Sequence, residues 1–507
     1  MKKNAFALSI AALVAGFAGS AYAVLPAGAA VDTTGADAAT LRFGNTGTGH
    51  MLVVPYFSTQ NGNSTLLSIV NTNETIGKAV KVRFRGAANS DDVYDFQVFL
   101  SPGDVWTANI SADATTGLST LTTNDNSCTK PSKTVLNSTP FVTSRLNGAA
   151  TDEVKANNTR EGYIEIFNMA DIPSSSTGVY PAIKHSASGV PTCSGTAWTA
   201  INTDMSVGDL SSNGLTNPTT GLAANWTIIN VPKAVAWSGA ATAIEAITGA
   251  TPPVLAKGNV VYFPQVSTNI NATTAGLYTA DPLLQGATPV VKGALYDLPD
   301  MSTPYTGAGT PSQQAIDLTA AIAATSVMNE YWTDPSIHAA TDWVFSMPTR
   351  RYAVAVNYGA VGGPAMVQNT SNGNYFDKDV NLQLNGDQIC VKDITPSVWD
   401  REERQPAAPD DVVISPSTPG APVLFCGETS VLTFNQAGAA ASGVLSATVA
   451  VKDIGVYQDG WLKLNTPGAV ATGLPILGQA FVAAFNPALP DGTSGNFNMG
   501  WEHRYTR

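Results

Sequence analysis

The sequence predicts a mainly β fold, made of antiparallel β-sandwich domains of Ig-like or jelly-roll-like type with long loops and one or two short helices. The composition favours strands joined by turns over helix bundles, because only 13% of the residues are charged while 45 Gly and 31 Pro interrupt the chain. A hydrophobic fraction of 44% is enough to bury a substantial core. Turns rich in Asn, Gly and Pro separate strand-like segments at a spacing of roughly ten residues.

The clearest strands lie near the start of the chain. We expect them over residues 51–57, 65–70, 78–84, 93–100 and 105–110. In the third of these, Val80, Val82 and Phe84 alternate with Lys81, Arg83 and Arg85. This alternation predicts a half-buried strand with one apolar and one charged face. Trp106 is predicted to be a core anchor.

The rest of the chain predicts two domains, residues 51–310 and 311–507, after a loose leader over 24–50. Exposed polar loops are expected over residues 111–160, 171–222 and 400–424. Helices are expected over residues 238–247 and 312–331, the second with apolar residues recurring at spacings of three or four. Further strands are expected at residues 162–167, 226–231, 260–263, 342–347, 351–356, 431–434, 443–451, 460–464 and 480–485.

The first 23 residues have the pattern of a secretory signal peptide. Lys2 and Lys3 form a basic start, residues 5–18 are almost purely apolar, and an Ala-Tyr-Ala box follows at 21–23. The apolar run is too short for a transmembrane span, and no cysteine follows the box to accept a lipid. We therefore expect Sec-dependent export of a chain that begins at Val24 and has no transmembrane segment.

The net charge is −12, and it becomes −14 once Lys2 and Lys3 are removed. An acidic chain without a basic stripe argues against nucleic acid as a partner. The acidity fits an exposed protein that stays soluble by self-repulsion, or one that recruits divalent cations.

Four cysteines lie in the exported part of the chain, where an even count predicts disulfides. Of the three pairings available, we expect Cys128–Cys193 and Cys390–Cys426, because each pair brackets a turn-rich stretch. Such cross-links are typically worth roughly 2–4 kcal/mol each.

Motifs for catalysis are mostly absent from the sequence: it contains no HExxH, no GxSxG, no Walker loop and no dinucleotide-binding glycine pattern. Two groups of loop carboxylates are candidate calcium ligands, although neither has the DxDxDG pattern. These groups are Asp91, Asp92 and Asp95, and Asp400, Glu402 and Glu403. No cofactor other than calcium is expected.

Several segments resemble a family of exported Gram-negative proteins that is described as cell-surface or surface-layer-like. They are VPY at 54–56, LSIVNT at 67–72, KAVKVRF at 78–84, DF at 95–96, LSP at 100–102, DVWT at 104–107, EGYIE at 161–165, NEY at 329–331, TDWV at 341–344, PTR at 348–350, WDREE at 399–403 and HRYTR at 503–507. The resemblance spans most of the chain. It implies a location at the cell envelope, and it carries no catalytic residues over to this sequence.

The preferred interpretation is a non-enzymatic cell-surface protein, a structural subunit of an outer coat or extracellular matrix whose main partners are further copies of itself and cell-envelope components. The alternative is an adhesin or a carbohydrate- or protein-binding module, with the long loops presenting a glycan or protein site. A hydrolase with carboxylates brought together by the fold is a third hypothesis.

Overall fold

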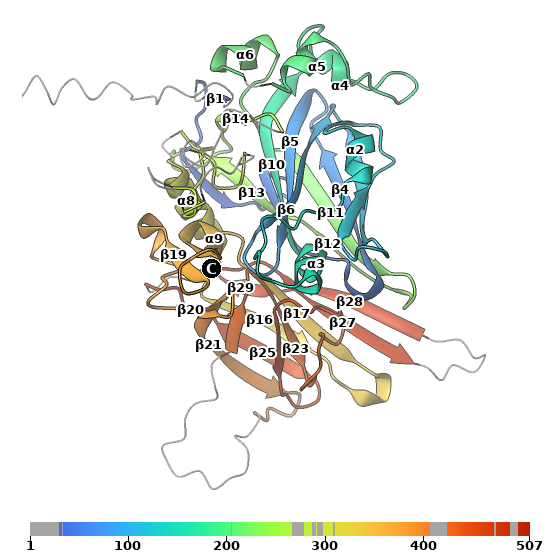
Figure 1. Cartoon of the computed structure of the whole chain (residues 1–507), viewed down its shortest axis with the longest axis vertical. Coiled ribbons are helices and arrows are strands. Elements are labelled where there is room, and N and C mark those ends of the chain that lie inside the picture. Colours follow the sequence, from blue (N-terminus) through green and yellow to red (C-terminus); the bar gives the residue numbers. More distant parts are fainter. Residues whose placement is uncertain are drawn as a thin grey trace, which may run out of the picture.

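The computed structural model of the chain describes residues 30–32, 34–203, 205–265, 278–285, 290–291, 298–307, 310–405, 423–470, 473–486 and 495–507. The expected signal peptide and residues 406–422 of the expected loop lie outside this range. Within it the fold is mainly β, as predicted, with two β-sandwiches that follow one another along the chain (Figure 1).

The first sandwich, in the upper half of Figure 1, packs a seven-stranded sheet on a five-stranded sheet. The seven-stranded sheet has the order β2 (Thr40–Phe43), β13 (Thr242–Ile247), β3 (Met51–Ser58), β10 (Glu161–Pro173), β5 (Ile76–Gly86), β6 (Asp92–Leu100) and β9 (Cys128–Lys130). The five-stranded sheet has the order β12 (Val235–Ala240), β11 (Leu222–Asn230), β4 (Asn63–Asn71), β7 (Val105–Ala112) and β8 (Ser119–Thr122). Trp106, the predicted core anchor, is fully buried between them.

The second sandwich, in the lower half of Figure 1, packs two further sheets around their own core. One sheet has the order β20 (Leu382–Asn385), β21 (Gln388–Asp400), β25 (Gly460–Asn465), β16 (Ser326–Tyr331) and β29 (Arg504–Thr506), with β22 (Val423–Cys426) also paired to β21. The other has the order β24 (Val451–Ile454), β23 (Thr429–Phe434), β17 (Ala340–Ser346), β27 (Gln479–Asn486) and β28 (Gly495–Glu502). Among the described strand pairs, β23 with β24 is parallel and the others are antiparallel.

Short elements complete the fold. The three small strand pairs are β1 (Ala30–Asp32) with β14 (Val260–Tyr262), β15 (Ala323–Ala324) with β26 (Leu474–Pro475), and β18 (Val354–Asn357) with β19 (Ala365–Gln368). The α-helices are α2 (Lys133–Ser138), α3 (Asp152–Arg160), α4 (Tyr180–Ile183), α5 (Thr196–Ala200), α6 (Val207–Ser212), α8 (Pro311–Ile322) and α9 (Arg350–Ala353). The 3-10 turns are η1 (Gln60–Gly62), η2 (Pro335–Ile337) and η3 (Thr370–Asn372). No helix in the described part of the chain has both the length and the apolar character needed to span a membrane.

The two sandwiches share buried contacts. Val344, Val431 and Phe481 of the second sandwich belong to the same apolar cluster as the interior of the first. The carboxylate of Glu161, on β10, accepts hydrogen bonds from the Thr448 backbone amide at 2.7 Å and the Gln60 amide at 2.6 Å. The division of the chain into domains at residue 310 stays a prediction.

The expected strands over residues 51–110 are confirmed as β3 to β7, but the third of them is not half-buried. The seven-stranded sheet is covered on both faces, by the five-stranded sheet on one side and by a second apolar cluster with α8 and the segment around Tyr305 on the other. Lys81, Arg83 and Arg85 are each 1% exposed. The charged side of the strand therefore lies in the interior, where its side chains need ionic partners.

Two helix predictions are wrong. Residues 238–247 form parts of β12 and β13, because residues 242–247 pair with β2 and β3. The helix expected over residues 312–331 ends at Ile322, and residues 326–331 form β16, which pairs with β25 and β29. Pairing between neighbouring strands outweighs the helical spacing of the apolar residues there. Thr310 caps the helix by accepting a hydrogen bond from the Gln313 amide.

The expected loops and leader also contain regular structure. Residues 111–160 include β8, β9, α2 and α3, and residues 171–222 include α4, α5 and α6. The described part of the leader contributes β1 and β2.

Candidate functional site

Both expected disulfides are present. Cys128 is bonded to Cys193, which ties α4 and its neighbours to β9. Cys390 is bonded to Cys426, directly opposite it on the adjacent strand. The two pairings are those predicted from the turn-rich stretch that each pair brackets.

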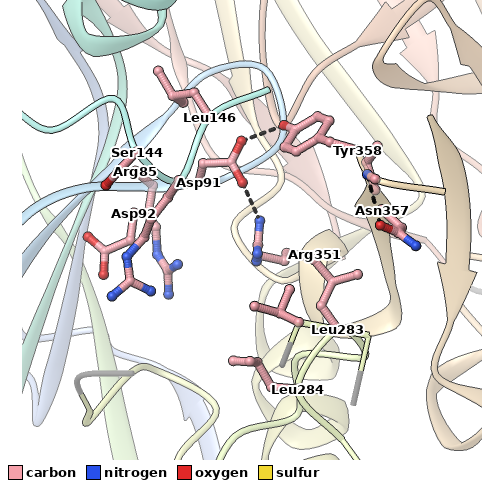
Figure 2. A pocket seen from close by; sticks show the side chains of 14 residues that line it. Arg85, Asp91, Asp92, Ser144, Leu146, Leu283, Leu284, Arg351, Asn357 and Tyr358 are labelled. Atoms are coloured by element: carbon pink, nitrogen blue, oxygen red, sulfur yellow. Dashed lines mark hydrogen bonds and ion pairs between the residues drawn. The ribbon is translucent and has the colours of Figure 1, made fainter. Parts of the chain in front are cut away.

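The first carboxylate group lies beside a cavity between the two halves of the chain. Asp91 precedes β6 and Asp92 begins it, and both line a cavity of about 430 Å³ (Figure 2). Arg351 of α9 and Tyr358, which follows β18, reach the same cavity from the second half of the chain. The rest of the wall is mixed: the apolar side chains are Leu146, Leu283, Leu284, Val291 and Val356, and the other residues are Arg85, Ser144, Arg145, Asn357 and Gly359.

Asp91 is held by two groups from the other half of the chain. One carboxylate oxygen is 2.9 Å from Arg351 Nη1, and the other accepts a 2.5 Å hydrogen bond from the Tyr358 hydroxyl (Figure 2). Burial raises the pKa of Asp91, although both partners favour its charged form. Burial, together with the nearby Asp91 carboxylate, raises the pKa of Tyr358 well above its usual range. The Arg351 guanidinium also contacts Asp281, at 2.7 Å.

Behind this cavity, the charged side of β5 is neutralised residue by residue. Arg83 lies 2.9 Å from Asp92, and Lys81 is paired with Asp95. Arg85 lies 3.1 Å from Glu165 on the adjacent strand. Glu165 also accepts a hydrogen bond from the Tyr352 hydroxyl of α9.

The three carboxylates proposed for calcium therefore separate into three ion pairs with different cations. The second group behaves similarly: Asp400 is bonded to Arg404 at 2.6 Å and Glu402 to Arg401 at 2.9 Å, while Glu403 is exposed. Over the described ranges, no group of three or more His, Cys, Asp or Glu side chains is placed to hold a metal ion. The structure brings neither group together as a ligand set, because every one of these carboxylates except that of Glu403 faces a guanidinium or an ammonium group.

The residues that sequence reasoning missed are the partners contributed by the second half of the chain. Arg350 and Arg351 lie in the segment expected as a turn and a strand, and they reach Glu428 and Asp91 respectively. The sequence did contain one indication of buried ion pairs, namely the charged residues that alternate with apolar residues on β5 and β10. In the sheet, Arg83 and Glu165 lie directly opposite each other. The register that places these two residues opposite each other cannot be read from the local sequence.

The chemical capacity of the cavity is limited by this pairing. Asp91, Asp92 and Arg351 each have an ionic partner, and the described lining contains no histidine or cysteine. The described ion pairs and hydrogen bonds join the two halves of the chain.

A second candidate surface is the outer side of the five-stranded sheet, at the right of the upper half of Figure 1. We call it the uncharged face, because no residue pointing outward from these five strands is charged. Its central row across the sheet is Thr122, Asn109, Leu66, Thr227 and Ser238. The remaining outward positions are Ser64, Ser68, Val70, Val105, Thr107, Ser111, Thr120, Ala223, Asn225, Ile229, Ala236 and Ala240.

The uncharged face is open to solvent and slightly hollowed. Leu66 near its centre is 41% exposed, and a groove of about 450 Å³ runs over β4, β7 and β11. The charged residues closest in sequence, such as Asp104 and Lys233, lie in the turns between strands. The large aromatic residues of this sheet, Trp106, Trp226 and Trp237, point into the core.

Comparison with family models, with curated proteins and with solved structures finds no match to this chain.

Proposed function

We propose that this chain is an exported, non-enzymatic cell-surface protein of a Gram-negative bacterium, and that its copies associate through the uncharged face into an outer coat or matrix. The observation that carries the proposal is a five-stranded sheet face without charge on a chain of net charge −12. Acidic copies repel one another over most of their surface, so a neutral face is where two copies approach at least electrostatic cost.

The size of the uncharged face is consistent with a contact between copies. Five strands spaced about 4.8 Å apart, each about seven residues long at 3.3 Å per residue, give a face of about 24 by 23 Å. Two such faces would bury on the order of 1,100 Å² in total, at the lower end of specific interfaces. A contact of this size is weak for an isolated pair and adequate when a coat repeats it many times.

The composition of the face favours a second copy over a carbohydrate. Threonine, serine and asparagine can exchange hydrogen bonds with the same residue types in another copy, and Leu66 supplies apolar area at the centre. The outward positions contain no aromatic side chain on which a sugar ring could stack.

The test is a charge introduced at the centre of the face. Thr227→Glu should abolish association of the purified chain, measured by sedimentation velocity over a range of concentrations, because two copies would bring carboxylates together. Thr395→Glu, at an exposed threonine on the second sandwich, is the matched control and should associate like the parent chain. Added salt should strengthen association of the parent chain by screening the repulsion between acidic copies. A parent chain that stays monomeric, or a Thr227→Glu variant that associates normally, would contradict the proposal.

A second candidate function is carbohydrate binding, and one observation favours it. Trp461 is 36% exposed on the outer side of β25 and stacks on Trp399 of β21 at 4.2 Å between ring centroids, with Glu330 opposite on β16. Exposed indole rings beside a carboxylate suit a sugar ring with hydroxyl groups. Binding on a glycan array that Trp461→Ala removes would support this function; an array without binding would count against it.

A further inference from the structure

Lys130 is buried, and no described residue provides a counter-ion for it. It ends β9 at the edge of the seven-stranded sheet and is 5% exposed. Its ammonium donates a 3.0 Å hydrogen bond to the Trp198 carbonyl and lies 3.9 Å from the centroid of the Trp198 ring. Neither partner is negatively charged.

The other buried lysines of the same sheet provide the contrast. Lys78 is 2.9 Å from Asp171, and Lys81 is paired with Asp95. In the part of the chain that the structure describes, no carboxylate lies within ion-pair distance of the Lys130 ammonium. Lysine is rarely buried without such a pair, because the charge loses its hydration.

The ammonium borders a cavity of about 420 Å³. Its described lining is otherwise uncharged and consists of Thr129, Pro131, Ser132, Trp198, Asn202 and Gln265. The buried Thr129 hydroxyl has no hydrogen-bond partner among the described residues. A cavity with one cation, neutral donors and an unsatisfied hydroxyl is suited to a small anion.

A carboxylate near this cavity, that of Asp95, does not neutralise the Lys130 ammonium. The Gln265 amide donates to the Asp95 carbonyl at 3.1 Å and also to the Asp95 carboxylate, which is paired with Lys81. Burial lowers the pKa of Lys130 to about 8, so the side chain is still mostly protonated at neutral pH.

We infer that this cavity binds a small carboxylate ligand, with the Lys130 ammonium as its counter-ion and the Thr129 and Ser132 hydroxyls and the Asn202 amide as additional donors. The inference does not depend on the proposed association, because the cavity lies at the β9 edge of the seven-stranded sheet and the uncharged face belongs to the other sheet of the sandwich. A carboxylate here would supply the negative charge that the protein itself provides for Lys78 and Lys81.

The experiment is a titration of the full chain with sodium acetate and with sodium D-glucuronate, followed by saturation-transfer NMR. D-glucose, which has the ring of glucuronate without the carboxylate, should not bind. Lys130→Met keeps the aliphatic stem over Trp198 and removes the charge, and it should weaken binding by about tenfold or more. Lys184→Met, at an exposed lysine, is the matched control and should bind like the parent chain. Equal affinity for both probes would mean that the carboxylate alone is recognised, and tighter binding of glucuronate would identify an acidic sugar; either result supports the site.

A pH series on the parent chain provides a test that does not depend on the folding of a variant. Carboxylate binding should weaken as the pH rises through about 8, because Lys130 then loses its proton. Absence of binding by the parent chain to both carboxylates would overturn the inference. So would a well-folded Lys130→Met variant that binds as tightly as the parent chain, or binding that is unchanged from pH 7 to pH 9.5.

Discussion

Two buried histidines should make the stability of this protein depend on pH in a way that substitution can isolate. His50 is fully buried before β3, where its Nε2 lies 2.8 Å from the Ala256 carbonyl and its Nδ1 lies 3.1 Å from the Ala246 amide. An amide can only donate, so Nδ1 must accept and Nε2 must carry the proton. A second proton would place two donors face to face.

His503 has the same arrangement in the second sandwich. Its Nε2 lies 3.1 Å from the Val344 carbonyl, its Nδ1 lies 3.0 Å from the Asn329 side-chain amide, and its ring stacks on Phe345. Burial lowers the pKa of His50 to about 4 and that of His503 to about 3. Each folded-state pKa is below the unfolded value of about 6.5, so each contributes stability that is present above pH 6.5 and is lost as the pH falls toward the folded-state value.

The magnitude follows from these pKa values. Between pH 7 and pH 5 the unfolded chain takes up a proton at each histidine and the folded chain does not, which costs about 2 kcal/mol per histidine. The buried carboxyl groups of Glu161 and Glu165 act in the opposite direction. Burial raises their pKa values, so their contribution is present below about 4.5 and is lost as the pH rises. The overall pH profile therefore mixes both effects.

Comparing variants at two pH values separates the histidines from the carboxyl groups. We expect His503→Gln to destabilise the protein at pH 7 because it disrupts a packed site. Its penalty, measured by urea unfolding with tryptophan fluorescence, should be about 2 kcal/mol smaller at pH 5. His50→Gln should show the same reduction, and His338→Gln at an exposed position controls for replacing a histidine. Equal penalties at pH 7 and pH 5 for both buried histidines would refute the reasoning.

Three further predictions concern the links within the fold. Arg351→Met leaves two buried carboxylates without their ionic partner and should lower the free energy of unfolding by about 3–5 kcal/mol in a urea titration. Arg401→Met, at an exposed pair, should leave the urea midpoint almost unchanged. Gly162→Ala should destabilise by on the order of 3 kcal/mol or more, because a Cβ there would lie 1.7 Å from the Arg85 carbonyl oxygen; Gly148→Ala, with open space around it, should be close to neutral in thermal unfolding. Adding a chelator should not change the melting temperature, because the carboxylates proposed as calcium ligands are largely held by Arg and Lys side chains. A melting temperature that falls with the chelator and recovers with calcium would contradict the view that these carboxylates serve as ion-pair partners.

The sequence was most informative about the existence of individual strands and least informative about which strands pair, since β3 and β4 are consecutive and lie in different sheets. The expected strands over residues 51–110 and both disulfides could be read from alternation, turn residues and cysteine spacing. The same alternation gave the wrong burial for β5, because it shows that a strand has two kinds of face without showing what covers each. Lys81, Arg83 and Arg85 are interior because a second layer covers that side of the sheet.

Neither candidate surface could be derived from local patterns. The pairing of Asp91 with Arg351 joins residues 260 positions apart, and it depends on the contact between the two sandwiches. Along each strand of the uncharged face, inward and outward residues alternate as in any half-buried strand. That the outward residues of all five strands form one surface without charge becomes visible only once the strand order is known. The burial of Lys130 likewise results from its position at a sheet edge beside Trp198.

The most direct test of association through the uncharged face is a distance between copies. The described cysteines are all in disulfides, so Thr227→Cys gives a single site for a nitroxide spin label. Pulsed electron paramagnetic resonance on the associated protein should then show a distance between labels no greater than the width of the face, about 24 Å. A label at Thr395→Cys should not show this distance. Associated protein in which the label at position 227 gives no distance in this range would contradict the account.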